Sequence, residues 1–191
     1  MRPSEGFTNQ RVGIFVDAQN LYHSAKNLYR GRVNYAELIK HLVAGRQLIR
    51  AMAYVVKSEG VVEPRHRDRD REDLPRRPES GLSSEASFFD ALTKAGLELR
   101  MKDLQIFGDG LKKADWDVGM AVDAIRMSSF LDVIIIVTGD GDFIPLVDYL
   151  KWGAGRLVEV AAFKRSASAK IQEAADRFIN IEEIPRAIIR R

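Results

Sequence analysis

The sequence contains no cysteine among its 191 residues. This absence excludes a disulfide scaffold, a thiolate zinc site, an iron–sulfur cluster and a cysteine nucleophile. Long apolar runs are missing as well, because the longest strongly apolar run, residues 133–137, is far shorter than the roughly 18 to 20 residues that cross a bilayer. The first ten residues also lack the apolar stretch of a secretory signal. We therefore expect a cytoplasmic protein that has no membrane partner.

A large excess of charge of either sign is absent too. Lys and Arg total 30 and Asp and Glu total 27, which leaves a net charge of +3. Such a small surplus is only a weak indication of an anionic partner. With 46% hydrophobic and 30% charged residues, the composition is typical of one globular domain with one core.

Several common catalytic motifs are missing. His23, His41 and His66 show no metal-ligand spacing, and the sequence has no HExxH. Neither a Walker A motif nor a GxGxxG loop follows the first apolar run, and residues 108–113 (GDGLKK) are typical of a turn. No GxSxG nucleophile elbow is present. The remaining candidates for chemistry are acidic residues.

Short apolar runs alternate with helical patterns along the chain. Residues 11–17 (RVGIFVD) and 46–56 (RQLIRAMAYVV) predict strands, and residues 35–43 predict a helix between them. The alternation continues with helices predicted over residues 85–95, 115–127, 143–152 and 167–175, and with strands in residues 97–107, 133–138, 156–162 and 177–181. This order predicts an α/β fold with a mostly parallel sheet and helices on both faces.

The chain divides into one expected domain, residues 11–184, with a loose tail at 1–10 and another at 185–191. Residues 58–84 interrupt the domain, and their centre, residues 65–79, holds six basic and five acidic residues with almost no apolar ones. Such a segment cannot bury enough surface to offset the entropy of ordering, so we expect an exposed, mobile insertion. Its mixed charge favours a solvated loop over a nucleic-acid-binding arm.

Three aspartates follow predicted strands. Asp17 ends the first strand, and Asp140 and Asp142 follow the strand at 133–138. Because ligands bind at the carboxyl ends of parallel strands, we expect these carboxylates to converge there. Their mutual repulsion favours a bound cation, and hard oxygen ligands suit Mg²⁺ or Mn²⁺. A plainer interpretation stays open for Asp17 and Asp142, since Asp is also a favoured helix N-cap.

The helix predicted at 115–127 adds further acidic residues. Its apolar face consists of Val118, Ala121, Val122 and Ile125, which we expect to pack on the sheet. At 100° per residue, Asp117 lies about 100° from Val118, at the edge of this face, and Asp123 lies about 140° away. Asp117 is therefore the best candidate for a fourth ligand and Asp123 a more distant supporting group, while Asp115 is a typical N-cap.

Three segments carry a family resemblance, and they occur in the family's order. They are VDAQNL at 16–21, KADWDVGMAVDAI at 113–125 and VTGDGDFIPLVDYL at 137–150. The chain resembles the NYN-domain, LabA-like proteins of the PIN-like nuclease superfamily. The similarity continues through GAGRLVEVAAF and AADRFINI, and so covers about residues 12–184 without the insertion.

The resemblance implies a three-layer α/β/α PIN-like (Rossmann-like) fold and a metal-dependent endoribonuclease that uses Mg²⁺ or Mn²⁺. The family's metal-binding and catalytic aspartates fall on Asp17, Asp117, Asp140 and Asp142, and Asp123, at a second acidic helix position, is a further expected metal-binding residue. Its RNA substrate, single-stranded or structured, would be positioned by Asn20 and Thr138 and contacted at phosphates by Lys112 and Lys113. For the two lysines, an ordinary solvated surface is an equally good interpretation.

Other functions remain open at this point. A non-catalytic PIN-like module that binds RNA or a partner protein in a regulatory role would show the same aspartates. A phosphatase of the haloacid-dehalogenase type is disfavoured, because it needs an Asp two residues after Asp17, where Gln19 stands. A homodimer, formed through the insertion or the apolar C-terminal segment, is a further expectation. Without the four implied ligands the chain has 30 basic and 23 acidic residues, or 30 − 23 = +7, which suits a polyanion.

Overall fold

The computed structural model describes residues 8–57, 84–103, 105–106, 112–113 and 116–190. Its centre is a six-stranded sheet in which every neighbouring pair of strands is parallel. The strands in spatial order are β4 (Glu98–Asp103), β3 (Gln47–Lys57), β1 (Arg11–Asp17), β7 (Val133–Val137), β8 (Leu157–Ala162) and β9 (Arg177–Asn180).

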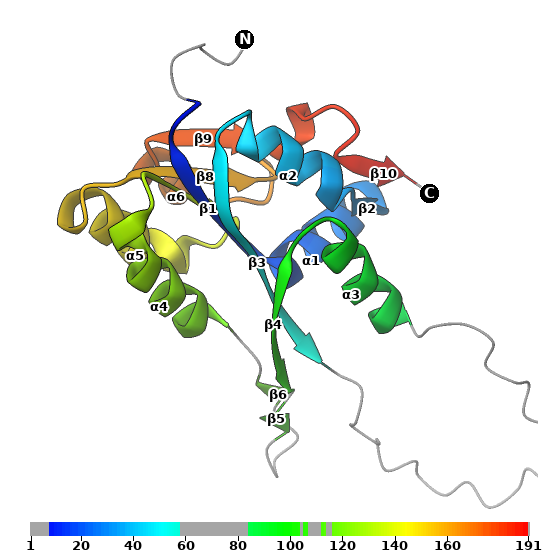
Figure 1. Ribbon diagram of the computed structural model, residues 1–191. Coiled ribbons are helices and arrows are strands. Elements are labelled where there is room, and N and C mark those ends of the chain that lie inside the picture. Colours follow the sequence, from blue (N-terminus) through cyan, green and yellow to red (C-terminus); the bar gives the residue numbers. More distant parts are fainter. Residues whose placement is uncertain (1–7, 58–83, 104, 107–111, 114–115, 191) are drawn as a thin grey trace, which may run out of the picture.

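Helices cover both faces of the sheet, which makes three layers (Figure 1). One layer holds α1 (Ala18–Tyr29), α2 (Tyr35–Val43) and α3 (Ser84–Lys94). The other holds α4 (Asp117–Met127), α5 (Ile144–Asp148) and α6 (Ala169–Ala174). The predicted α/β/α architecture with a parallel sheet is therefore confirmed.

The central strands are apolar on both sides because each side faces a helical layer. In β1, Val12, Ile14 and Val16 pack toward α1, α2 and α3, whereas Phe15 packs toward α4 and α5. All four side chains are fully buried. The nearly continuous apolar run in this strand thus reflects burial on both faces of a parallel sheet.

The strand order sets the place of a ligand site. From β1 the chain moves outward to β3 and β4, and it then returns to β7 on the other side of β1 before continuing to β8 and β9. Between β1 and β7 the direction of winding reverses, and open α/β sheets bind ligands at the carboxyl ends of strands at such a point. Asp17 ends β1, and Thr138 follows β7 directly.

Helix α4 corrects one prediction. Its buried residues are Met120 and Ala124, whereas Val118 is 74%, Val122 45% and Ile125 39% exposed. The reason is that the helix carries two apolar stripes with the same spacing, one at 118, 122 and 125 and one at 120, 124 and 127. Periodicity alone cannot choose between them, and the stripe with the smaller Ala124 is the one that packs closely on the sheet.

Short elements complete the described chain. Strands β5 (Gln105–Ile106) and β6 (Lys112–Lys113) pair antiparallel, and the predicted turn between them lies outside the described residues. The single-turn helices are η1 (Ser128–Phe130), η2 (Gly141–Phe143), η3 (Tyr149–Gly153) and η4 (Ile181–Glu183). The predicted insertion lies outside the described residues except for Ser84, as do the first seven residues of the predicted N-terminal tail.

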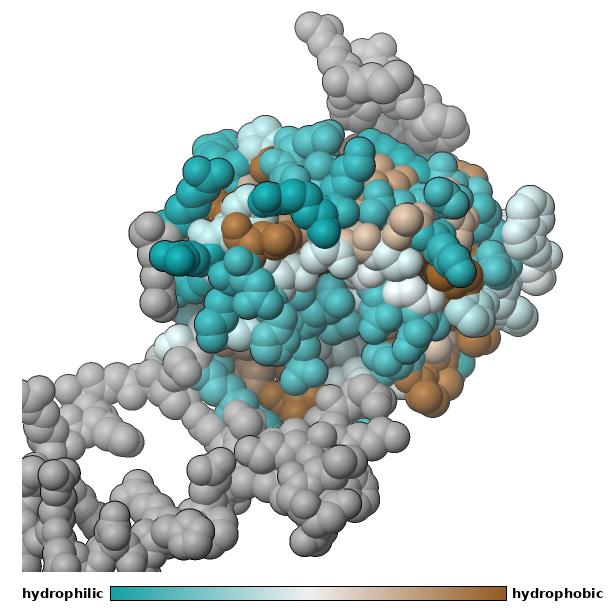
Figure 2. All heavy atoms as spheres, turned by 180° about the vertical axis from the view of Figure 1, so that it is seen from behind, coloured by the Kyte–Doolittle hydropathy of each residue, from teal (hydrophilic) through white to brown (hydrophobic). Residues whose placement is uncertain are grey.

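The described surface lends no support to the expected homodimer. The face seen from behind is mainly hydrophilic, with apolar areas between the polar ones (Figure 2). Exposed apolar residues elsewhere, such as Val118, Val122 and Ile125 of α4, form a short row, and such limited exposure is normal on a protein surface. Among the described helices, none combines the length and the apolar character needed to cross a membrane.

The C-terminal segment differs from the expected tail. Strand β10 (Ile188–Arg190) pairs antiparallel with β2 (Gly31–Val33), a short strand that the sequence analysis missed. The pairing depends on a glycine, because a Cβ atom at Gly31 would lie 2.6 Å from the backbone oxygen of Ile189. Two strands of three residues carry too little periodicity to be recognised from sequence.

Gly31→Ala is expected to release β10 from β2 and leave the main sheet folded, because the added methyl group meets backbone rather than a movable side chain. Amide hydrogen exchange checks this: Ile189 should lose protection, while the β1 amides keep theirs. Gly45→Ala is the matched control, since no atom lies within 4 Å of a Cβ there, although its positive φ adds local strain. Unchanged protection at Ile189 in Gly31→Ala would contradict the prediction.

Candidate functional site

Asp17 both caps a helix and stands at the carboxyl edge of the sheet. Its Oδ1 atom accepts a hydrogen bond from the backbone N–H of Asn20 at 3.0 Å, which makes it the N-cap of α1. Its Oδ2 atom accepts a hydrogen bond from the hydroxyl of Thr138 at 3.1 Å. The plainer capping interpretation is therefore correct for Asp17, and it does not compete with a role in a site.

Thr138 and Asn20 tie the end of β7 to the start of α1. The Thr138 side chain is fully buried, and its Oγ1 atom also accepts from the backbone N–H of Asp140 at 3.2 Å. The side-chain oxygen of Asn20 accepts from the backbone N–H of Gly139 at 3.1 Å. The predicted residues Asp17, Asn20, Thr138 and Asp140 thus belong to one hydrogen-bonded group, in which Thr138 lies beneath the carboxylates and orients them.

Asp140 and Asp142 occupy the turn after β7. Asp140 Oδ1 accepts from the backbone N–H of Asp142 at 2.9 Å, so Asp140 is the N-cap of η2. Asp142 follows in the first turn and is exposed. The N-cap role that the sequence suggested for Asp142 therefore belongs to Asp140.

Two glycines let the Asp140 turn pack closely against the loop before α6. A Cβ at Gly139 would lie 3.0 Å from the Cα of Ala167, and one at Gly141 would lie 3.1 Å from the hydroxyl oxygen of Ser168. The backbone N–H of Ser168 also donates to the carbonyl of Gly139 at 2.9 Å. These contacts fix the position of Asp140 between β7 and α6.

The electrostatics of Asp17 favour a positive charge beside it. Burial raises the pKa of Asp17 above its ordinary value, and the neighbouring charge of Asp140 adds to this. The hydrogen bonds from Asn20 and Thr138 work in the opposite direction but do not outweigh burial. A bound cation would offset both the burial and the repulsion.

Helix α4 begins beside this edge of the sheet. The indole N–H of Trp116, the residue before the helix, donates to the carbonyl of Val55 near the carboxyl end of β3 at 2.9 Å. Asp117 is the first residue of α4 and is partly buried. At 100° per residue it lies about 40° from the middle of the face formed by Met120 and Ala124, so it is directed toward the sheet.

Asp123 has partners outside the strand-end group. It accepts a hydrogen bond from the hydroxyl of Tyr54 at 3.0 Å and forms an ion pair with Arg100 at 3.4 Å. Of the remaining predicted residues, Lys112 and Lys113 form β6, but their side chains are not among those described. Asp115 lies outside the described residues, so its predicted capping role is untested.

The donor set fits a hard divalent cation of the magnesium type. Within the described part of the chain, no three His, Cys, Asp or Glu side chains are grouped as a ready-made metal cage. Mg²⁺ usually needs no such cage, because it binds through one or two carboxylates and completes its shell with water and substrate phosphates. Asp17 and Asp140, each with carboxylate oxygen lone pairs left over after its hydrogen bonds, supply such a pair.

Two tyrosines near the site escaped the sequence analysis. The pKa of Tyr35, a residue of α2, is raised above its ordinary value. Burial is the main cause, and the negative charge of Asp17 is the second. Tyr54 of β3 is paired in register with Asp17 and is 2% exposed. In the sequence, both tyrosines stand at positions that are typical of aromatic core residues. No local motif therefore distinguishes them from residues that only pack in the core.

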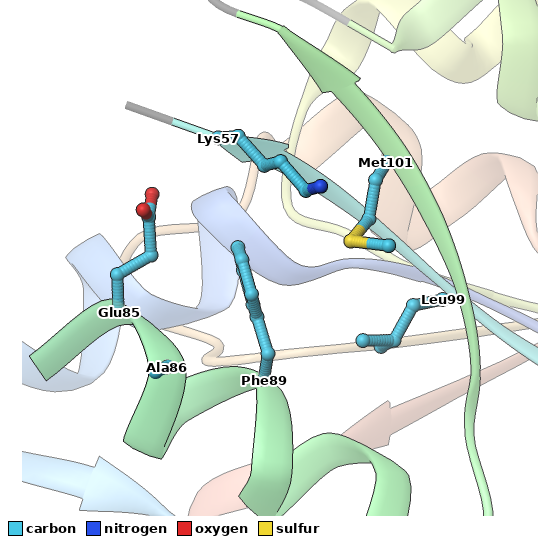
Figure 3. A pocket seen from close by; sticks show the side chains of 6 residues that line it. All are labelled: Lys57, Glu85, Ala86, Phe89, Leu99 and Met101. Carbon is cyan, nitrogen blue, oxygen red and sulfur yellow. The ribbon is translucent and has the colours of Figure 1, made fainter. Parts of the chain in front are cut away.

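A pocket of about 420 Å³ lies on the α3 side of the sheet (Figure 3). The ring of Phe89 stands between α3 and the strands, and the ammonium group of Lys57 extends toward Met101 (Figure 3). The other lining residues are Glu85, Ala86 and Leu99. None of the predicted site residues lines this pocket, which is therefore separate from the carboxylates at the ends of β1 and β7.

A parallel sheet with an acidic group at its topological switch point defines the chain as an α/β protein of the PIN-like type. The chain belongs to the NYN domain family, whose model matches residues 11–182. The resemblance noted in the sequence is thereby confirmed, and the matched range includes every predicted site residue.

Two similar proteins extend this assignment. The chain is 22% identical over 187 residues to the low amplitude and bright protein LabA of Synechococcus elongatus, with 93% of this chain and 87% of LabA covered. A solved structure, a protein of unknown function from Vibrio parahaemolyticus, is 26% identical and superposes with a TM-score of 0.77. That match covers 95% of this chain and 98% of the other, so the two share the whole fold.

Proposed function

We propose that this protein is a metal-dependent ribonuclease that hydrolyses RNA phosphodiester bonds at the carboxyl ends of β1 and β7. The observation that carries the proposal is the hydrogen-bonded group in which Thr138 links the carboxylate of Asp17 to the turn of Asp140. The group stands at the switch point of a parallel sheet, where α/β folds bind their ligands. Membership of the NYN domain family supports the same reaction class.

In this proposal Asp17 and Asp140 would hold Mg²⁺ or Mn²⁺, which would supply Lewis acidity at the scissile phosphate and activate a water for in-line attack. Asn20 and Thr138 keep the Asp17 oxygens in a fixed orientation, and Ser168 keeps the Asp140 turn in place. Such fixed geometry is what an electrostatic mechanism requires, because the donors need not reorganise during reaction.

Further residues complete the proposed site. Asp142 is exposed in the first turn of η2 and would meet solvent, a second ion or substrate. Asp117 would approach from α4 as an additional ligand. Lys112 and Lys113, just before that helix, would contact RNA phosphates without reading sequence.

Incubation of the purified protein with single-stranded and with structured RNA tests the proposal directly. We expect cleavage with Mg²⁺ or Mn²⁺ and none with EDTA, because the carboxylates alone do not polarise the phosphate. A reaction that continues in EDTA would refute the metal-dependent mechanism. Comparison of the two RNA types identifies the substrate class.

A non-catalytic RNA-binding module is the second candidate function. It would use the same group at the carboxyl ends of β1 and β7 and leave the RNA intact. In that case the same RNA should bind without cleavage, and binding should weaken steeply with salt as phosphate contacts release counterions. Fluorescence anisotropy at several salt concentrations, run beside the cleavage assay, separates the two functions.

A further inference from the structure

Tyr54 lies between the two elements that carry the proposed ligands Asp17 and Asp117, namely strand β1 and helix α4. It lies in β3 directly opposite Asp17 of β1, and its side chain packs on the α4 side of the sheet. The residue is only 2% exposed. A buried phenol needs a hydrogen-bond partner, and the partner here is on α4.

Tyr54 contacts α4 on both sides of Asp117 in the sequence. Its hydroxyl donates to Asp123 Oδ2 at 3.0 Å, six residues after Asp117. Its ring meets the ring of Trp116, the residue before Asp117, edge to face with centroids 5.6 Å apart. Trp116 is in turn fixed by its hydrogen bond to the carbonyl of Val55, the neighbour of Tyr54. Helix α4 is therefore linked to β3 at its start, through Trp116, and near its middle, through Asp123.

The carboxylate of Asp123 is already compensated. It accepts a hydrogen bond from the Tyr54 hydroxyl and lies 3.4 Å from the guanidinium of Arg100. Only 15% of the Asp123 side chain is exposed. A carboxylate that accepts a hydrogen bond and faces a cation of its own chain has little need of a metal ion. Asp123 differs in this respect from Asp17, which faces the negative charge of Asp140.

We infer that Tyr54 and Asp123 are positioning residues that set the place of Asp117 relative to Asp17, and that Asp123 is not itself a metal ligand. This inference rests on the proposed metal-dependent function. Loss of the Tyr54 hydroxyl would remove the hydrogen bond from β3 to the middle of α4 and let Asp117, at the start of the helix, shift. A misplacement of about 1 Å in a catalytic constellation can cost on the order of 100-fold in rate.

Three variants test the inference: Tyr54→Phe, Asp123→Ala and Asp123→Asn. The first two remove the hydrogen bond, and we expect each to weaken Mn²⁺ binding by about 10-fold or more, as loss of a group that orients a ligand does. Asp123→Asn keeps an oxygen that accepts from Tyr54, so its Mn²⁺ affinity should stay within about threefold of the wild type, the effect of losing the Arg100 ion pair. Isothermal titration of Mn²⁺ into the RNA-free protein gives these affinities.

Kinetics supply a second readout. Tyr54→Phe should lower kcat for RNA cleavage and leave KM for RNA nearly constant, because Tyr54 is buried and does not touch substrate. Circular dichroism melting shows whether the variants are folded, and the Asp123→Asn comparison decides the question even if Tyr54→Phe is unstable.

The outcomes are distinct. Weak Mn²⁺ binding by Asp123→Asn as well as Asp123→Ala would make Asp123 a direct ligand and overturn the inference. Wild-type affinity and kcat in Tyr54→Phe would show that its hydroxyl serves packing alone, which also overturns it. If the wild-type protein neither binds Mn²⁺ nor cleaves RNA, the proposed function fails, and this inference fails with it.

Discussion

Asp17→Asn is expected to reduce metal-dependent RNA cleavage by at least about 100-fold, because even groups that only orient a metal ligand contribute 10- to 100-fold. The same variant should be more thermally stable than the wild type at neutral pH. Asn is as good an N-cap as Asp, so the hydrogen bond from the Asn20 backbone is kept. The negative charge is lost, and with it the affinity for a cation. The NH2 group that replaces Oδ2 cannot accept from Thr138, so it must donate to Thr138 Oγ1 instead.

The stability gain follows from the direction of the pKa shift. Burial raises the pKa of Asp17 in the folded protein above its ordinary value of 3.8. The stability linked to the protonated form is fully present below that ordinary value and is lost as pH rises through the folded pKa. At pH 7 the wild type therefore bears the cost of a buried charge that Asn does not carry. The difference between the two melting temperatures should disappear below about pH 4.

Asp148→Asn is the matched control for this experiment. Asp148 is an exposed aspartate at the end of α5, so its replacement changes the net charge equally without touching the strand ends. The cleavage rate and the melting temperature of the Asp148→Asn variant should stay close to those of the wild type. Cleavage by Asp17→Asn at the rate of Asp148→Asn would show that the proposed site is wrong.

The topology explains why the strand-end group could be predicted from sequence. Asp17 and Asp140 follow the two most apolar strands, and a parallel sheet brings the carboxyl ends of its strands to one edge. The pairing of β1 with β7 then makes them neighbours. The sequence could not show that the Thr138 hydroxyl links the two turns through its hydrogen bond to Asp17. Thr is β-branched and common in and beside strands, so its presence after β7 is not informative.

Tertiary packing decided the features that sequence missed. The inner face of α4 contains Met120 and Ala124, and the small Ala124 side chain lets the helix approach the sheet closely. Tyr54 is joined to Asp123 across a separation of 69 residues, which no local pattern encodes. The same holds for β10, whose partner β2 lies at the other end of the chain.

Glu159→Ala is expected to lower the free energy of unfolding by about 3–5 kcal/mol, the largest stability effect that we expect from a single change. Glu159 lies in β8, and its two carboxylate oxygens accept from Arg46 at 3.0 and 2.9 Å. Both side chains are nearly buried, with 8% of Arg46 and 10% of Glu159 exposed. Without Glu159, the guanidinium of Arg46 keeps only the carbonyls of Leu42 and Val43 and becomes an uncompensated buried charge.

Glu98→Ala provides the exposed comparison. Glu98 forms an ion pair with Arg50 at 2.9 Å through one hydrogen bond, and both side chains are 52% exposed. Water and salt compensate the arginine there, so the loss should stay within about 1 kcal/mol. Urea unfolding at pH 7 measures both variants against the wild type. Equal losses for the two variants would contradict the prediction, because the Arg46–Glu159 pair is both buried and joined by two hydrogen bonds.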